Sequence, residues 1–399
     1  MTRHVLTLNS GSSSIKFALF EPGAEPVEKL RGQVDGLGSH PQISAAGDCI
    51  ETVESDLDPA AGDHEGALSA ILDLLEEAIH GIEILSVGHR IVHGGTGYGE
   101  PVVLDRDILM ELAHLNPLAP LHQPHNLAGV EAAMIAFPDA VQVGCFDTAF
   151  HRKHPWVNDT FALPGEYYDA GIRRYGFHGL SYEYIVGRLG EVSPVHAAGR
   201  AVVAHLGNGA SMCAIRSGQS VGSTMGFTAL DGLPMGTRCG QLDPGVVLYL
   251  IREKGMSVEE VEDLLYSHSG LKGLSGLSND MRELETSGTD AATGAIDYFV
   301  SRVRRELGAM AAVLSGIDCL VFCGGIGEHA ADVRSRICRD MDWLGVTLDE
   351  TRNANGERVI SADASAATVF VIPTNEEIVI ARHASHAVQA GASLEALIA

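Results

Sequence analysis

Two segments of the chain, 4–20 and 201–215, share a pattern that constrains the fold more strongly than any other feature. Each consists of an apolar run, a short cluster of Asn, Gly and Ser, and a second apolar run. Such apolar runs are typical of strands, and the small polar cluster tolerates the positive φ angles of a tight turn. The pattern therefore predicts the same strand–turn–strand hairpin twice.

The repeated hairpin differs from the common phosphate-binding loops, which both lead into a helix. Neither G-x-x-x-x-G-K-[ST] nor G-x-G-x-x-G occurs in the chain. A pair of hairpins could instead present backbone N–H groups and hydroxyls to a polyphosphate from two sides. Alternatively, the two segments are ordinary tight turns in a β-rich region without a role in phosphate binding. The repetition of the pattern makes this alternative weaker.

Length, charge and cysteine usage limit the class of protein. A chain of 399 residues with 45% apolar residues is long enough for two domains with large cores. The formal charge of −25 argues against nucleic acid or an anionic membrane as partner. An anionic substrate would need local Arg, oriented amides and a divalent cation. Seven Cys without a C-x-x-C pair, and the lack of a long apolar stretch, predict a cytoplasmic location and no membrane span.

Helical periodicity alternates with strand-like runs, which predicts an α/β fold. A helix over 64–80 would bury one face, formed by Leu68, Ile71, Leu72, Leu75 and Ile79. Asp243 with Pro244 predicts the start of a helix that ends at Gly255, and Ser257 with Glu260 forms a capping box for a helix that ends near Gly270. Further helices are expected over 289–315 and 380–399, and strands over 84–92, 140–145, 201–206, 319–323 and 368–372. We expect one domain over 1–150 plus about 380–399, and a second over 151–379.

Charged and imidazole side chains gather at the ends of apolar runs, where loops carry chemistry on a rigid scaffold. The motifs are G-H-R-I-V-H-G-G at 88–95, L-H-Q-P-H-N at 121–126, F-D-T-A-F-H at 146–151, R-Y-G-F-H-G at 174–179, M-G-T-R-C-G at 235–240, G-G-I-G-E at 324–328 and T-N-E-E at 374–377. Each has a plainer interpretation. Arg90 could form a surface ion pair, Asp147 could cap a turn, and His178 could be a core histidine. The glycines at 324–327 could connect a strand to a helix starting at Ala330, and Glu376 with Glu377 would suit the first turn of a helix.

In this order, and together with N-S-G-S-S-S-I-K-F and H-L-G-N-G-A-S, the motifs resemble the acetate kinase family from residue 5 to about 382. The resemblance implies the actin-like ATPase fold, with two ribonuclease-H-like domains related by duplication and the active site in the cleft between them. It also implies a homodimer, and reversible transfer of the ATP γ-phosphoryl group to acetate, giving acetyl phosphate and ADP. Mg²⁺ would assist, with Mn²⁺ as a substitute. The first domain would lie on the acyl-substrate side, and the second would bind nucleotide and dimerise.

The resemblance also implies roles for residues that match the family's motifs. The catalytic group would be Asp147, His178 and Arg238, with His122 nearby. Arg90 would bind the carboxylate, in an acyl pocket with Val92, Leu121 and Phe177. Asn9 and Glu376 would hold Mg²⁺. Nucleotide would contact Lys16, His205, Leu206, Gly207, Asn208, Gly209, Asp280, Met281, Arg282, Gly325, Ile326, Gly327, Glu328 and His329.

These residue types suit phosphoryl transfer, in which a protein mainly positions groups and stabilises charge on the equatorial oxygens. Arg can grip carboxylate or phosphoryl oxygens with two hydrogen bonds. A carboxylic acid substrate is already ionised at neutral pH, so the nucleophile needs no deprotonation. Although the family's usual assignment gives Asp147 a proton-transfer role, we therefore hypothesise that it orients a metal-bound water or Arg238.

The sequence departs from the family's usual motifs at Gln123, Leu180, Tyr182, Ala229, Cys239 and Gln241. Family members usually carry Pro where this chain has Ala229, in the stretch that matches the acyl pocket. Loss of the ring leaves room for about one methylene group, worth about 0.8 kcal/mol when filled. The change predicts measurable activity toward propionate.

Four other functions fit parts of the sequence. A propionate or butyrate kinase would carry nearly the same motifs. The pairs His122/His125 and His151/His154 are compatible with a metal-dependent hydrolase, although H-E-x-x-H is absent. Ser220 in G-Q-S-V-G invites a serine hydrolase, but no helical segment follows it, so a turn is the better prediction. A non-catalytic scaffold would need neither Arg90 nor Arg238.

Overall fold

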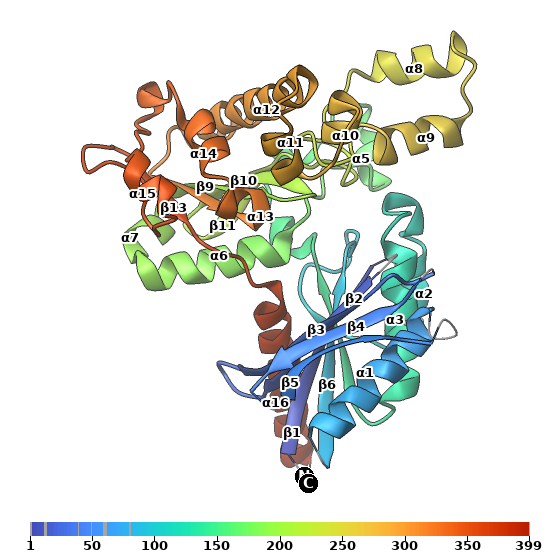
Figure 1. Cartoon of the computed structure of the whole chain (residues 1–399). Coiled ribbons are helices and arrows are strands. Elements are labelled where there is room, and N and C mark those ends of the chain that lie inside the picture. Colours follow the sequence, from blue (N-terminus) through green and yellow to red (C-terminus); the bar gives the residue numbers. More distant parts are fainter. Residues whose placement is uncertain are drawn as a thin grey trace. The chain divides into compact units, whose positions relative to one another are not determined.

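The computed structural model describes the backbone over residues 2–11, 14–38, 40–48, 50–58, 62–79 and 81–398, with side chains described from residue 3 to residue 390 within these ranges. The chain forms two compact units, shown in Figure 1. Unit 1 comprises Met1–Phe150 and Asn375–Ala399, and unit 2 comprises His151–Thr374. The chain returns to unit 1 several residues before the expected position near 380, because helix α16 (Glu376–Ile398) begins there and packs on the sheet of unit 1.

Within its described residues, unit 1 contains an eight-stranded sheet in the order β5-β4-β3-β2-β1-β6-β8-β7. The strands are β1 (Thr2–Ser10), β2 (Ser14–Glu21), β3 (Val27–Asp35), β4 (Gln42–Gly47), β5 (Ile50–Asp56), β6 (Ile82–Ile91), β7 (Val102–Val103) and β8 (Val141–Phe146). The first five strands pair antiparallel, whereas β1, β6 and β8 run parallel. The strands expected over 84–92 and 140–145 are confirmed.

Helices cover both faces of this sheet. On one face α1 (His64–Ala78) and α3 (Gln123–Ala136) pack together, while α2 (Arg106–Ala113) adjoins α3. The predicted apolar face of α1 is confirmed for Leu68, Ile71 and Leu75, which are buried with Phe17 in one core cluster. The opposite face receives α16 on β1, β6 and β8. A Cβ at Gly88 would lie 2.5 Å from Ile380, so this glycine permits the close packing of α16.

Unit 2 repeats the central part of this arrangement. Within its described residues it has a five-stranded sheet in the order β11-β10-β9-β12-β13. The strands are β9 (Arg200–Leu206), β10 (Ala210–Arg216), β11 (Gln219–Ser223), β12 (Cys319–Cys323) and β13 (Thr368–Val371). Strands β11, β10 and β9 pair antiparallel, like β3, β2 and β1 in unit 1, and β9, β12 and β13 run parallel, like β1, β6 and β8. The shared topology supports a duplicated unit.

The helices of unit 2 are α4 (Trp156–Asp159), α5 (Gly165–Asp169), α6 (Gly179–Val192), α7 (Pro194–Ala197), α8 (Pro244–Arg252), α9 (Val258–Ser267), α10 (Gly270–Ser275), α11 (Met281–Ser287), α12 (Asp290–Leu314), α13 (Gly324–His329), α14 (Ala331–Cys338) and α15 (Glu350–Ala354). The caps predicted at Asp243 and Ser257 are confirmed, including the capping box with Glu260. However, α8 ends at Arg252, before the expected Gly255. Helix α12 lies over one face of the sheet and α6 over the other (Figure 1).

Both predicted hairpins are confirmed. In the first, Asn9 faces Lys16 and Ser10 faces Ile15; two residues of its predicted turn, Ser12 and Ser13, lie outside the described residues. In the second, Leu206 faces Ala210 across a turn in which the Gly207 N–H donates to the Gly209 carbonyl over 3.1 Å. None of the described helices is long and apolar enough to cross a membrane.

Candidate active site

Three predicted site residues of unit 1 lie at one edge of its sheet, where the parallel strands end. Asn9 and Arg90 are next to last in β1 and β6, and Asp147 directly follows β8. Because the carboxyl ends of neighbouring parallel strands meet at the same edge, these side chains converge. Arg90 makes a bidentate ion pair with Asp147, with Nη2 2.7 Å from Oδ2 and Nε 3.2 Å from each carboxylate oxygen.

Two further oxygens surround the Arg90 guanidinium. Its Nη1 donates to Asn9 Oδ1 over 3.4 Å, and its Nε lies 3.8 Å from Glu376 Oε2 in the first turn of α16. Burial disfavours the charge of Arg90, but Asp147 and Glu376 outweigh it and raise the pKa of the guanidinium. Arg90 therefore pairs with a buried carboxylate rather than in a surface ion pair, and Asp147 lies in a turn while it binds Arg90.

The oxygens of this cluster suit a magnesium ion. Asn9 offers an amide oxygen and Glu376 a carboxylate, and both already face one cation, the guanidinium of Arg90. Mg²⁺ prefers hard oxygen ligands and keeps several waters, so it needs only one or two protein groups. Among the described residues, no cluster of three or more His, Cys, Asp or Glu side chains is arranged to hold a metal.

Two predicted acyl residues, Val92 and Leu121, belong to unit 1. Val92 is buried, and its N–H donates to Asn126 Oδ1 over 2.9 Å, while Asn126 Nδ2 donates to the Ser10 carbonyl over 2.5 Å. Asn126 thereby connects the ends of β6 and β1, a role that no motif indicated. His122 is half-buried at the N-cap of α3, and Leu121 beside it has 45% of its surface exposed.

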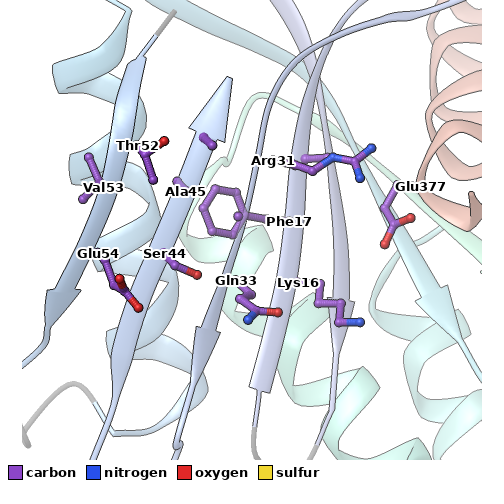
Figure 2. A pocket seen from close by; sticks show the side chains of 13 residues that line it. Lys16, Phe17, Arg31, Gln33, Ser44, Ala45, Thr52, Val53, Glu54 and Glu377 are labelled. Atoms are coloured by element: carbon purple, nitrogen blue, oxygen red, sulfur yellow. The ribbon is translucent and has the colours of Figure 1, made fainter. Parts of the chain in front are cut away.

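Lys16 lies on the wall of a cavity of about 510 Å³ in unit 1, shown in Figure 2. Arg31, Gln33 and Glu377 share that wall, above the strands β2 to β5. Lys16 is also the cross-strand partner of Asn9, which places it next to the Arg90 cluster. Its contact with nucleotide stays a prediction.

In unit 2, the turn of the second hairpin brings two predicted catalytic side chains together. A Cβ at Gly209 would lie 3.2 Å from both Arg238 Nη2 and His178 Nε2. The guanidinium of Arg238 is anchored by a hydrogen bond, in which its Nη1 donates to the Ala229 carbonyl over 2.8 Å. The loop that carries Arg238 is tied to the turn by the Gly236 N–H, which donates to the Asn208 carbonyl over 2.9 Å.

His178 caps α6 in a left-handed conformation, with φ of 57°, which is uncommon outside glycine. Its Nδ1 lies 2.8 Å from Ser211 Oγ on β10, and its ring stacks on that of His205 at 4.3 Å. His205 Nδ1 in turn lies 2.8 Å from Ser181 Oγ. The left-handed backbone of His178 and its half-buried ring beside the glycine turn favour the hypothesis of a functional histidine over that of a satisfied core histidine.

A second cavity, of about 430 Å³, opens beside the same turn. Eight predicted nucleotide residues line it: Gly207, Asn208, Asp280, Met281, Arg282, Gly325, Ile326 and His329. The others do not line it: Leu206 is buried in β9, and Gly327 is buried in α13. Glu328 Oε1 accepts from the N–H groups of Gly324 and Thr374 at 2.8 and 3.1 Å, so it braces the loop.

The glycine-rich segment was expected to precede a helix at Ala330. Instead Gly324–His329 itself forms the short helix α13, and α14 begins at Ala331. No motif indicated Arg334, whose fully buried guanidinium donates to the carbonyls of Gly327 and Glu328 at 2.9 Å. Arg334 thus satisfies carbonyls at the end of α13 from beneath the cavity.

Phe177 is buried, and its carbonyl bonds to His151 Nε2 over 2.9 Å. His151 Nδ1 and His154 Nε2 both bond to Ser220 Oγ, at 2.8 and 2.6 Å. Ser220 is therefore buried on β11, so the turn predicted for it is wrong; the turn falls earlier, at Ser217 and Gly218. A side chain enclosed in this way cannot serve as a nucleophile elbow.

These geometries can be compared with known proteins. The Acetokinase family matches residues 4–382 of this chain. The chain belongs to the acetokinase family. It is 58% identical over 393 residues to acetate kinase of Methylocella silvestris, covering 96% of this chain and 97% of that protein.

Solved structures of acetokinases agree. Acetate kinase of Porphyromonas gingivalis aligns with a TM-score of 0.87 and 37% identity, covering 97% of this chain and all (100%) of that one. A propionate kinase of Francisella tularensis aligns with a TM-score of 0.90 and 35% identity, covering 96% and 98%. The resemblance inferred from the motifs and the actin-like ATPase fold are both confirmed.

The departures from the usual acetokinase motifs have defined places. Gln123 is buried and pairs with the backbone of His93, accepting from its N–H and donating to its carbonyl, each at 3.0 Å. Leu180 and Tyr182 are buried in α6. Cys239 is half-buried, and exposed Gln241 accepts from Arg302 over 2.7 Å. Nothing in the structure explains Cys239 or Gln241 in terms of the site.

Proposed function

We propose that this chain is an acetate kinase, which transfers the γ-phosphoryl group of ATP reversibly to acetate and yields acetyl phosphate and ADP. It is then a phosphotransferase with a carboxylate acceptor. The observation that carries the proposal is the convergence of His178 Nε2 and Arg238 Nη2 above Gly209, at the edge of the 430 Å³ cavity. The family and the relatives named above support it.

Arg238 and His178 are suited to bind the oxygens of the transferred group. The guanidinium presents planar donors, and its second fork nitrogen is anchored to the Ala229 carbonyl, so it is already oriented before substrate binds. Gly209 lets both donors approach the hairpin turn without a side chain between them. The 430 Å³ cavity would hold the nucleoside, and the turn at 207–209 its phosphates.

In unit 1, Arg90 would bind the carboxylate of the acceptor, and Asn9 with Glu376 would hold Mg²⁺ or Mn²⁺. When bound, the metal ion would neutralise charge on the phosphate oxygens. Lys16 would add a positive charge next to Asn9.

Asp147 is better suited to orienting Arg90 than to transferring a proton. Its carboxylate accepts the bidentate pair from Arg90 and is buried. Acetate arrives ionised at neutral pH, so no proton has to be removed. We infer that Asp147 keeps the guanidinium in the plane that an acceptor carboxylate requires. Its proposed action on Arg238 stays a prediction.

The acyl preference is open to a second candidate, propionate. Ala229 lies beside Arg238, since its carbonyl accepts from Arg238 Nη1, and we infer that its small side chain leaves more room for the acyl group than the usual Pro. Hydroxylamine trapping of acyl phosphate, with Mg·ATP and acetate, propionate or butyrate in parallel, tests both candidates. We expect hydroxamate fastest from acetate, with measurable product from propionate. No hydroxamate from any of the acids would overturn the proposed function.

A homodimer in the cytoplasm is the proposed state of the enzyme. No residue of α8 is buried, and Leu248 and Tyr249 expose 50% and 53% of their surface. An apolar helix left in water favours an interface. Sedimentation should give a dimer for the native chain and a monomer for Leu248→Glu, with Val195→Glu, 74% exposed on α7, as a control that stays dimeric. A monomeric native chain would contradict the proposal.

A further inference from the structure

Tyr182 places a phenol hydroxyl at a position where the acetokinase motif usually has His. Tyr182 lies one turn after His178 on α6, and its backbone N–H donates to the His178 carbonyl over 3.1 Å. Its side chain is completely buried. Residues four apart on a helix share a face, so the phenol points toward the same part of the sheet as the imidazole.

Ser211 joins the two side chains. Its Oγ lies 2.5 Å from the Tyr182 hydroxyl and 2.8 Å from His178 Nδ1. Ser211 is buried on β10, where it faces His205 across the hairpin. The backbone of the nucleotide hairpin thus fixes the serine, and the serine contacts the imidazole on the side away from Gly209.

The direction of the hydrogen bonds follows from acidity. A phenol is a stronger donor than an aliphatic hydroxyl, so Tyr182 donates to Ser211, and the Ser211 hydrogen is left for His178 Nδ1. Burial raises the pKa of Tyr182 well above its usual value of 10, so the phenol retains its proton. Nδ1 then accepts, and Nε2 carries the imidazole proton. Nε2 is the nitrogen that lies above Gly209 with Arg238 Nη2.

We propose that Tyr182, acting through Ser211, is a positioning residue that holds His178 as the Nε2–H tautomer, with this donor directed at the transferred phosphoryl group. The proposal rests on the proposed function, in which His178 contacts that group. The left-handed backbone of His178 and the stacked ring of His205 restrict the imidazole further. The hydroxyl pair selects which nitrogen is the donor.

The kinetic test compares single and double variants. We expect Ser211→Ala to lower kcat about 30-fold and Tyr182→Phe about tenfold, with KM for ATP and acetate within about twofold, because the lost interaction acts in the transition state. The double variant should be no slower than Ser211→Ala, since the tyrosine acts through the serine. The matched control is Tyr175→Phe, which removes another buried hydroxyl, bonded to the Gly171 carbonyl at 2.7 Å, and should keep native kcat.

Equal kcat for Tyr182→Phe and Tyr175→Phe would overturn the proposal, as would single losses that multiply in the double variant. A change confined to KM would also overturn it. These outcomes separate positioning from stability, because both tyrosine variants lose one buried hydrogen bond.

The tautomer of His178 can be measured by NMR, independently of enzymatic activity. In native protein with ¹⁵N-labelled histidine, with the His178 signals assigned from the spectrum of His178→Gln, we expect a protonated Nε2 and an unprotonated Nδ1. In Tyr182→Phe the two tautomers should become mixed. A protonated Nδ1 in the native protein would overturn the proposal even when the variants fail to fold. Lack of acyl phosphate formation, with the Nε2–H tautomer intact, would refute the proposed function and leave the tautomer inference standing.

Discussion

The central strands of the two units follow the same order, yet ionic interactions hold the site residues of unit 1 and neutral hydrogen bonds hold those of unit 2. In unit 1 the residues at the strand ends form a charged cluster, with Arg90 between Asp147, Glu376 and Asn9. In unit 2 the corresponding hairpin supports neutral hydrogen-bonded chains, from Tyr182 through Ser211 to His178 and from Ser181 to His205. The same arrangement of strands thus supports a charged cluster in one unit and neutral hydrogen-bonded side chains in the other.

The difference matches the two tasks proposed for the site. A partly buried ion pair adds little to stability but fixes a guanidinium in one plane, which suits recognition of a carboxylate. A neutral chain fixes which nitrogen of an imidazole donates, which suits an oxygen whose charge grows during transfer. The four predictions below test this contrast, from the largest expected effect to the smallest.

Asp147→Asn should have the largest effect. The variant removes the negative charge and one of the two acceptors that hold Arg90, so we expect kcat to fall about 100- to 1,000-fold. The hydroxamate assay measures it, with the exposed Asp139→Asn as control. Near-normal turnover with unchanged Mg²⁺ dependence would contradict the role of the charged cluster.

Acid should unfold unit 2 before unit 1. Burial lowers the pKa of His89 in unit 1 and of His151 in unit 2 to about 4, and that of His154 in unit 2 to about 2. These folded-state values lie below the unfolded value of about 6.5, so the stability is present above pH 6.5 and is lost as the pH falls from there toward 4. At pH 4 the loss is about 3 kcal/mol for His151 alone, and unit 2 has the additional His154.

Trp156 and Trp343 are the two tryptophans of the chain, and both lie in unit 2. Both are largely exposed, so the buried Tyr175 and Tyr182 of unit 2 are the better reporters, and near-UV circular dichroism should change at a higher pH than the remaining far-UV signal. A near-UV transition that follows the loss of the far-UV signal would contradict the expectation.

Gly209→Ala should disturb both donors of unit 2 at once. The added Cβ would lie 3.2 Å from Arg238 Nη2 and His178 Nε2, so both must shift by a few tenths of an ångström. We expect kcat to fall about 30-fold while ADP affinity changes less than about threefold. Gly187→Ala on α6, where a Cβ meets open space, is the control. An equal effect of both substitutions would show that convergence above Gly209 is unimportant.

Gln123→Asn should have the smallest effect. The shorter amide cannot reach both the N–H and the carbonyl of His93, so the variant loses about 1 kcal/mol of unfolding free energy. Calorimetry should show Tm lower by about 2 °C, with kcat within a few-fold of native. A raised Tm would show that the longer side chain is strained.

Much of the fold follows from local patterns in the sequence. The capping box at Ser257, the Asp243–Pro244 start and the apolar face of α1 were predicted because caps and periodicity act within one or two turns. The helix α13 over the glycine-rich segment could not be predicted locally, because glycine lowers helix propensity, whereas Arg334 and Glu328 bind its backbone groups in the folded chain.

Some residues of the candidate site could likewise be predicted from the sequence, and others could not. The order of the motifs sufficed to place the chain in its family, and it indicated Arg90, Asp147, His178 and Arg238 as site residues, which stays a prediction. Asn126 and Ser211 end two of the quoted motifs, but the motifs indicated no role for either residue, and Arg334 lies outside all of them. Their roles depend on which residues face each other across strands.

The sequence by itself determined the two hairpins, the helix starts and the identity of the chemical groups, since each depends on neighbours within a few residues. Only the tertiary structure decided that Asp147 holds Arg90 and that Tyr182 acts on His178 through Ser211. Those contacts depend on strand register and on the direction of side chains from separate elements. A shift of one residue in register would turn Arg90 on β6 and Ser211 on β10 to the other face of their sheets.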